Sequence, residues 1–347
     1  MTRIVFFYNA GSDNPYMTLL TGALRRAGYD VACVEGCSPW WLWKNRNLVD
    51  ILHFQWVQYF YVGGHSWSST LWALIFLAKL FLARWMGFKL VWTVHNLMPH
   101  ERSPGLGDRI AHGGLAFLAD EIVVHCHAAA ALLQKTFVTR GRIHVIPHGH
   151  YAGWYHENTS RSEARAYFNI PESEYVYLYF GSIRPYKGLE RLIRTFRTLP
   201  AGSLVIAGKP SDSRAEGKIR KWCRDDPRIS LHLSFIPDAQ VPCLFECCDS
   251  VVLPFSDVLT SGSAILALSL GRPVIAPSLG CLPELVSGRL GLLFDPESPS
   301  GLENSMTEIR HRHYSSEEIK SHMREHYDWR DIAKCYGALY GRKARSH

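Results

Sequence analysis

The amino-acid sequence predicts an α/β protein made of two doubly wound domains. The chain has 347 residues, which is too long for one ordinary hydrophobic core. Short apolar runs alternate with amphipathic stretches, a pattern typical of parallel sheets covered by helices on both faces. The alternation pauses over the polar residues 151–172 and then resumes. We therefore predict two α/β halves of similar size that face a cleft, with a division near residue 160.

The predicted strands of the first half are short apolar runs: Ile4–Tyr8, Val31–Val34, Ile51–Phe54, Leu90–Val94, Ile122–His125 and Ile143–Ile146, with a helix through Leu19–Ala27. The second half is predicted to contain strands at Tyr175–Phe180, Leu204–Ala207, Ile229–Leu233, Ser250–Leu253 and Val274–Ala276, and helices at Gly188–Thr198, Cys243–Cys247 and Ala264–Leu270. In such sheets ligands bind beyond the carboxyl ends of the strands, so the residues after each strand are the candidates for a site.

Composition excludes several classes of protein. Hydrophobic residues make up 47% of the chain and aromatic residues 12%, whereas a disordered chain is poor in both. The formal net charge of +7 favours anionic partners such as nucleotide phosphates or acidic lipid. The basic residues are spread along the chain and form no recognised nucleic-acid-binding module, so we expect no nucleic-acid partner.

The cysteines and the N-terminus favour a cytoplasmic protein. The nine cysteines contain no C-x-x-C pair and are odd in number, which is unlike the disulfide framework of a secreted protein. The sequence MTRIVFFYNAGSDNPY reaches polar residues after five apolar ones and has no signal-peptide pattern.

The strongest motif, Gly181-Ser-Ile-Arg-Pro-Tyr-Lys-Gly188, directly follows a predicted strand. Gly181 permits close approach of a ligand to the backbone, and Arg184 and Lys187 place two cations before a helix N-terminus. This combination suits a pyrophosphate, with a bidentate guanidinium fork and a compact ammonium charge. The alternative is a solvated basic turn.

A second motif, Pro254-Phe-Ser-Asp-Val-Leu-Thr-Ser-Gly-Ser263, lies between a predicted strand and an apolar helix. Thr260, Ser261 and Ser263 supply hydroxyl groups, and Gly262 again permits close approach of a ligand. We interpret it as a second anion-binding loop. Helix capping alone is the alternative, because Ser and Thr are favoured at N-caps.

These motifs carry a family resemblance. Together with SGSAILALSLGRPVIAPSLGCLPELV and GLLFDP, they resemble the nucleotide-binding half of GT-B glycosyltransferases of the family-4-like group. The sequences Asn14-Pro-Tyr16, Thr93-Val-His-Asn-Leu-Met-Pro-His-Glu101 and His148-Gly-His-Tyr151 are similar to the β-mannosyltransferases that use GDP-mannose in xanthan-type exopolysaccharide assembly. The resemblance covers roughly residues 4–335 and implies a nucleotide-sugar donor and a lipid-linked saccharide acceptor at the inner face of the cytoplasmic membrane. The alternatives are a UDP-glucose or UDP-glucuronate donor, and a catalytically silent sugar-nucleotide binder or membrane scaffold.

The resemblance also implies a domain arrangement. Residues 1–160 would bind the acceptor and residues 161–320 the donor, and the helical segment 321–347 would cross back to the first domain. Family enzymes of this fold generally work without a bound metal, so we expect no cofactor. A dehydrogenase is disfavoured because no G-x-G-x-x-G motif opens the first helix.

One departure from the family concerns the mechanism. Retaining family-4 enzymes usually carry two glutamates at a spacing of E-x7-E, and aligning on Gly271-Arg-Pro-Val274 places Val258 and Leu266 at those positions. The sequence therefore favours an inverting transfer. Glu284 stands where the family has its Pro-Glu pair and either binds the donor or caps a helix.

An inverting transfer needs a general base for the acceptor hydroxyl. The amino-terminal half offers Asp13, His95, His100, Glu101 and His150. We interpret Glu101 as the base and His95 as a contact to the sugar or phosphate, with Asp13 as a further catalytic candidate. The alternative is a structural role for Glu101 or His95. The acceptor side is predicted to include the loop after the first strand and the end of the sixth: Gly11, Asn14, Tyr16, His148 and His150.

The segment Leu71–Lys89 carries large apolar residues at most positions. As a helix it could lie in a membrane interface with Trp72 and Trp85 at the headgroups and Lys79, Arg84 and Lys89 near acidic lipid. A buried helix of the domain core is the alternative.

Overall fold

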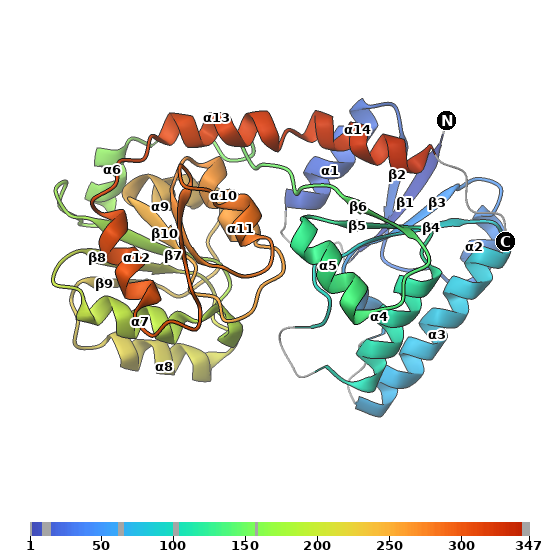
Figure 1. Cartoon of the computed structure of the whole chain (residues 1–347), viewed down its shortest axis with the longest axis horizontal. Coiled ribbons are helices and arrows are strands. Elements are labelled where there is room, and N and C mark those ends of the chain that lie inside the picture. Colours follow the sequence, from blue (N-terminus) through green and yellow to red (C-terminus); the bar gives the residue numbers. More distant parts are fainter. Residues whose placement is uncertain (1, 9–14, 62–65, 100–103, 157–158, 342–347) are drawn as a thin grey trace. The chain divides into compact units, whose positions relative to one another are not determined.

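The computed structural model describes residues 2–8, 15–61, 66–99, 104–156 and 159–341 (Figure 1). It contains two six-stranded sheets, and every strand pair within them is parallel. Helices cover both faces of each sheet. The predicted architecture of two Rossmann-like α/β domains is therefore confirmed.

The first sheet has the strand order β2-β1-β3-β4-β5-β6. Its strands are β1 (Arg3–Phe7), β2 (Asp30–Val34), β3 (Ile51–Phe54), β4 (Lys89–Thr93), β5 (Glu121–Val124) and β6 (Arg142–Val145). The helices in this part of the chain are α1 (Pro15–Arg26), α2 (Pro39–Asn45), α3 (Ser66–Trp85), α4 (Leu106–Leu118) and α5 (His127–Thr136), with a short 3₁₀ helix, η1 (Val57–Phe60). The six predicted strands are all present, each within a residue or two of its expected bounds.

Alternation along the strands separates the two faces of the first sheet. Ile4, Ile51 and Val91 face a buried cluster that includes α1 and the last helix of the chain, α14 (Trp329–Tyr340). On the other face, the ring of Phe54 contacts Phe76 of α3 at a centroid distance of 5.8 Å. Burial on both faces explains why these strands are continuous apolar runs.

Helices α3 and α4 approach each other closely at two glycines. A Cβ on Gly107 would lie 2.8 Å from the backbone of Ser69, and one on Gly114 would lie 2.3 Å from the side chain of Leu77. Any larger residue at Gly107 would therefore push the two helices apart.

The helix predicted over Leu71–Lys89 ends earlier than expected, and this corrects the predicted lipid contacts. Lys89 begins β4, where its ammonium group pairs with Glu121 at 3.2 Å and donates to the Leu339 carbonyl at 2.7 Å. Arg84 pairs with Asp120 at 2.8 Å. Both cations are held within the fold by buried carboxylates, so the prediction that they lie near lipid is wrong.

The second sheet has the strand order β12-β11-β10-β7-β8-β9. Its strands are β7 (Val176–Phe180), β8 (Ser203–Ala207), β9 (Ile229–His232), β10 (Ser250–Val252), β11 (Val274–Pro277) and β12 (Gly291–Phe294). The helices are α6 (Arg161–Tyr167), α7 (Leu189–Thr198), α8 (Ser213–Cys223), α9 (Val241–Cys247), α10 (Gly262–Ser269), α11 (Leu282–Leu285), α12 (Gly301–Ile309) and α13 (Ser316–His326), with 3₁₀ helices η2 (Pro185–Lys187) and η3 (Asp238–Gln240). Strand β12 was not among the predicted strands.

One buried cluster of the second unit lies on the face of the sheet that α7, α8 and α12 cover. Leu192 and Phe196 of α7, Ile219 of α8 and Met306 of α12 pack on Tyr177, Leu204 and other inward-facing strand residues. On the other face α6 packs on α9, and α10 packs on α13 (Figure 1).

The chain divides into two compact units, residues 1–149 with 327–347 and residues 150–326. The division lies before the expected residue 160 because Tyr151 and Trp154 hydrogen-bond to Ser269 and Asp238 of the second unit. At the other end, Asp328 caps α14 by accepting from the Arg330 amide at 2.7 Å, and α14 packs on α1. The first unit therefore contains the C-terminal helix.

Candidate functional site

In each sheet the strand order reverses at one point. The predicted motifs follow the two strands on either side of that point. In the second sheet this switch lies between β7 and β10, the first and fourth strands along that unit. The Gly181–Gly188 loop follows β7, and the Pro254–Ser263 loop follows β10. Ligands of doubly wound sheets bind at such a switch, outside the carboxyl ends of the strands.

The two predicted anion-binding loops converge at Gly181. A Cβ placed on Gly181 would lie 3.1 Å from Ser263 Oγ and 3.3 Å from Lys187 Nζ. The backbone φ of Gly181 is +124°, a conformation that favours glycine. Residues from two loops, distant in sequence, therefore surround one open backbone position with an ammonium group and a hydroxyl group.

Lys187 is the most unusual charge of this site. Its Nζ donates to Ser182 Oγ at 3.3 Å and lies 6.0 Å from the centre of the Phe255 ring. Among the described residues, no carboxylate lies within ion-pair distance of it. Burial, together with the nearby charge of Arg184, lowers the pKa of Lys187 to about 8. A partly buried cation without a counter-ion is a ready site for an anionic group.

The backbone holds the two loops together. The Ser256 amide donates to the Tyr186 carbonyl at 2.9 Å, and the Ser256 hydroxyl donates to the same oxygen at 3.1 Å. Gly188 has φ +68°, and a Cβ there would lie 1.9 Å from the Pro254 carbonyl oxygen. Only glycine fits at this crossing, which fixes Lys187 beside the second loop.

The second loop divides its hydroxyl groups between capping and the open site. Ser261 caps α10 by accepting from the Ala264 amide at 3.1 Å, so its hydroxyl serves the helix. Ser263 instead faces Gly181. Thr260 is partly buried, and Gly262 is exposed, with the Tyr151 hydroxyl 3.5 Å from where its Cβ would stand.

The positions aligned with the two family glutamates are apolar and buried. Val258 is 9% exposed and Leu266 is 6% exposed. Neither side chain can hydrogen-bond a ribose or stabilise a cationic sugar. Glu284 lies on the short helix α11 and is exposed.

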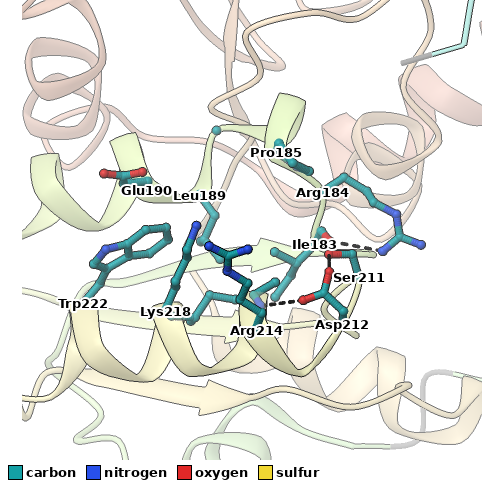
Figure 2. Close-up of a pocket in the computed structure, with 13 residues that line it drawn as sticks. Ile183, Arg184, Pro185, Leu189, Glu190, Ser211, Asp212, Arg214, Lys218 and Trp222 are labelled. Atoms are coloured by element: carbon teal, nitrogen blue, oxygen red, sulfur yellow. Dashed lines mark hydrogen bonds between the residues drawn. The ribbon is translucent and has the colours of Figure 1, made fainter. Parts of the chain in front are cut away.

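A pocket of about 450 Å³ adjoins the Gly181–Gly188 loop. Figure 2 shows Arg214, Lys218 and Trp222 rising from α8 toward the turn at Pro185, while Arg184 extends to the other side and donates to the Ile183 carbonyl at 3.1 Å. This pocket was not predicted from the sequence. The spacing of residues 214, 218 and 222, one face of a helix, is the signal that could have indicated it.

In the first sheet the switch lies between β1 and β3, and Tyr16 and Gln55 follow those strands. His95, after β4, lies beside them: its ring stacks on Trp56 at 4.3 Å and meets Tyr16 edge-on at 5.1 Å. Its Nε2 lies 2.8 Å from Gln55 Oε1, an oxygen that can only accept, so Nε2 carries the proton. Burial and the neighbouring histidines hold the pKa of His95 well below its usual range.

The structure adds one histidine that the sequence analysis did not select, His125 at the end of β5. Its ring centre lies 5.2 Å from that of His95 and 5.6 Å from that of His148. Its Nδ1 donates to the Ile146 carbonyl at 2.9 Å, while its buried Nε2 has no hydrogen-bond partner among the residues that the structure describes. Burial lowers the pKa of His125 to about 4 and that of His148 to about 3. The three strand ends therefore present a cluster of neutral imidazoles.

A hydrogen-bonded chain connects this histidine cluster to the C-terminal helix. The Tyr340 hydroxyl lies 2.8 Å from His53 Nδ1, and His53 Nε2 lies 2.8 Å from Thr93 Oγ1. Gln55 Nε2 donates to the same Thr93 oxygen at 3.4 Å, and Gln55 in turn meets His95. Helix α14 thus fixes the orientation of the side chains at the strand ends.

The remaining predicted site residues are placed as follows. Gly11, Asp13, Asn14, His100 and Glu101 lie outside the described residues. His150 begins the second unit, and its Nδ1 accepts from the Ala152 amide at 3.1 Å. In the described part of the chain, no group of three or more His, Cys, Asp or Glu side chains is arranged to hold a metal ion.

Comparisons with known proteins agree with this geometry. A family model described as "Glycosyl transferases group 1" matches residues 174–311, and one described as "Glycosyltransferase Family 4" matches residues 36–150. A GDP-mannose:glycolipid 4-beta-D-mannosyltransferase of Xanthomonas campestris pv. campestris is 30% identical over 85% of this chain and 79% of its own length. A D-inositol 3-phosphate glycosyltransferase of Mycolicibacterium smegmatis is 28% identical over 56% of this chain and 46% of its own length.

Solved structures show the same fold. A sucrose-phosphate synthase from Thermosynechococcus elongatus superposes with a TM-score of 0.74 at 20% identity and covers 98% of both chains. Anabaena HepE in complex with UDP-glucose superposes with a TM-score of 0.73 at 17% identity, covering 98% of this chain and 99% of that one. Taken with the two family models and the Xanthomonas relative, these matches establish that the chain belongs to the group 1, family-4-like glycosyltransferases of the GT-B fold.

Proposed function

We propose that this glycosyltransferase moves mannose from GDP-mannose to a lipid-linked saccharide, with inversion, in the assembly of an exopolysaccharide. The observation that carries the proposal is Lys187, a partly buried cation with no carboxylate partner in the described part of the chain, beside Gly181 and Ser263. The choice of donor and acceptor is supported by the Xanthomonas relative, whose name gives GDP-mannose and a glycolipid.

The diphosphate of the donor is assigned to the second unit. Lys187 and Arg184 supply positive charge, and Ser263 supplies a hydroxyl at the N-terminus of α10. These groups stabilise the negative charge that grows on the leaving phosphate as the sugar departs. In this proposal the transfer needs no added divalent cation, and activity that persists in a chelator would support that.

Inversion is supported by the two buried apolar residues in place of the family glutamates. Without a carboxylate at Val258 or Leu266, nothing at those positions can stabilise the sugar on the face that a retaining mechanism uses. An acceptor hydroxyl then attacks the sugar carbon directly, its proton passes to a base, and the carbon–phosphate oxygen bond breaks with the electron pair leaving on GDP. The product is β-linked. An α-linked product in the NMR spectrum would contradict inversion.

The acceptor side is assigned to the strand ends of the first unit. His95 and His148 place neutral imidazoles at these strand ends, and the half-buried Trp56 adds an aromatic ring suited to a sugar. Glu101 remains our choice of base, with His95 as a contact to the substrate. Replacing Glu101 by Gln should abolish transfer and spare donor binding.

The experiment that tests the donor is a thermal-shift titration with GDP, UDP and ADP in parallel. A ligand that binds only the folded state raises its stability with the logarithm of its concentration. Selective stabilisation by GDP supports the proposal, and a preference for UDP keeps the reaction but changes the donor. The Lys187→Ala variant should lose the response, whereas Lys221→Ala, an exposed lysine on α8, should keep it. Binding of GDP without turnover of GDP-mannose would indicate a silent binder.

A further inference from the structure

The exposed face of α3 is an uninterrupted apolar stripe. Leu71, Leu74, Ala78, Phe81 and Trp85 are all exposed, and their spacing of three and four residues places them on one side of the helix. Phe81 is 57% exposed and Trp85 is 83% exposed. A soluble surface helix normally presents polar residues on this side.

The opposite side of α3 is buried in the first unit. Ala73, Phe76, Leu80 and Ala83 are each at most 3% exposed, and the helix packs closely on α4. Residues 68–85 are long and apolar enough to cross a bilayer, with mean hydropathy 1.2. Because one side of α3 packs in the core of the first unit, the helix is suited to lie along a membrane surface and not to cross the bilayer.

The neighbouring helix α2 extends this apolar surface. Its Trp40 and Trp43 are 67% and 48% exposed, and their rings stack at 5.3 Å. Helix α2 contacts α3. Tryptophan is enriched where a protein meets the headgroups of a membrane, since its ring is apolar and its N–H is polar.

Within α2 and α3 every charged side chain is basic. Neither α2 nor α3 contains an Asp or Glu, whereas Lys44 and Arg46 are exposed at the end of α2. The Arg46 guanidinium lies 4.4 Å above the Trp43 ring. A cationic edge beside an apolar face complements a bilayer that contains acidic lipid.

We propose that the apolar face formed by Trp40, Trp43, Leu71, Leu74, Phe81 and Trp85 docks on an acidic lipid bilayer, with α3 lying in the plane of the membrane interface. This inference rests on the proposed function, in which the acceptor is a glycolipid, and it identifies the surface that brings the enzyme to that acceptor.

Co-sedimentation with vesicles tests the proposal. Vesicles of phosphatidylcholine with and without phosphatidylglycerol are mixed with the wild type, with the double variant Phe81→Ser/Trp85→Ser, and with Lys44→Gln/Arg46→Gln. The apolar double variant should bind the acidic vesicles at least ~10-fold more weakly, because it removes two large side chains from the lipid contact. The charge variant should lose the preference for phosphatidylglycerol and the sensitivity to salt.

Tyr167→Ser is the matched control, since Tyr167 is a 69% exposed aromatic residue on α6 of the second unit. Its vesicle binding should equal that of the wild type. Equal binding by Phe81→Ser/Trp85→Ser, or no binding by the wild type, would overturn the proposal. If the wild type forms a dimer in sedimentation velocity and Phe81→Ser/Trp85→Ser is a monomer, the face is a contact between two copies of the chain instead.

Stabilisation by GDP, measured on the same variants, separates the two proposals. The docking variants should respond to GDP as the wild type does, because the substitutions lie in the first unit and the Lys187 site in the second. Loss of vesicle binding with a retained GDP response supports docking. A wild type that binds vesicles but no nucleotide would contradict the donor assignment alone.

Discussion

Ser263 Oγ lies 3.1 Å from the position that a Cβ on Gly181 would occupy. The gap between these two residues is where the loops after β7 and β10 meet, and it is kept open by the absence of a side chain. Gly181→Ala would both fill this gap and force an L-residue to adopt φ +124°. We expect the variant to lose nucleotide binding, measured by calorimetry with GDP. Gly217→Ala on α8, where a Cβ meets nothing within 4 Å, should bind normally.

The lowered pKa of Lys187 predicts a pH dependence of donor binding. Below about pH 8 the ammonium group is charged and attracts the diphosphate, and above it the charge is lost. The affinity for GDP should therefore fall as the pH rises from 7 to 9, by up to about tenfold per unit above the pKa. Calorimetry in buffers of different ionisation enthalpy should also detect proton uptake on binding.

Lys187→Arg provides the control for that dependence. A guanidinium stays charged throughout this pH range, so residual GDP binding by the variant should be insensitive to pH between 7 and 9. A wild-type affinity that does not change over the same range would contradict a titrating role for Lys187.

Much of the fold could be predicted because its signals are local. Strand and glycine patterns indicated the two loops after β7 and β10, and Gly181 and Ser263 meet because parallel strands bring their carboxyl ends together. Strand β12, Gly291–Phe294, was not predicted, although it is as long as β3 and β11, which were. The environment of His125 depends on the register of three strands, which no local pattern reveals.

The exposed side of α3 could not be identified from the sequence either. Apolar residues occupy both sides of this helix, so no periodicity distinguishes the core side from the outer one. Arg84 and Lys89 form ion pairs with Asp120 and Glu121, which lie beyond α4 in the sequence. The two cations therefore pair with buried carboxylates and do not face solvent or lipid, and a pattern local to α3 could not indicate this.

Substitution of Gly149 tests how α14 is held to the first unit. A Cβ at this position would lie 2.3 Å from the Trp329 ring. Gly149→Ala should therefore lower the free energy of unfolding by about 1–3 kcal/mol, the usual cost of overpacking a core. Urea denaturation measures this, and Gly217→Ala should act in the opposite direction, since alanine favours a helix interior by about 0.5–1 kcal/mol. Equal stability of Gly149→Ala and the wild type would show that α14 is loosely attached.

Acid should destabilise the protein through its buried histidines. Burial lowers the pKa of His53 and His148 to about 3 and that of His125 to about 4, whereas an unfolded histidine titrates near 6.5. Between these values the unfolded chain binds more protons than the folded one, so stability is full above about pH 7 and is lost as the pH falls through 6.5. The slope should approach about 1.4 kcal/mol per pH unit for each histidine involved.

Urea titrations at pH 8, 7, 6 and 5 measure this slope. His148→Asn, which can still donate to the Gly149 carbonyl, should reduce the slope by one proton. A free energy of unfolding that stays constant from pH 8 to 5 would contradict neutral burial of this cluster.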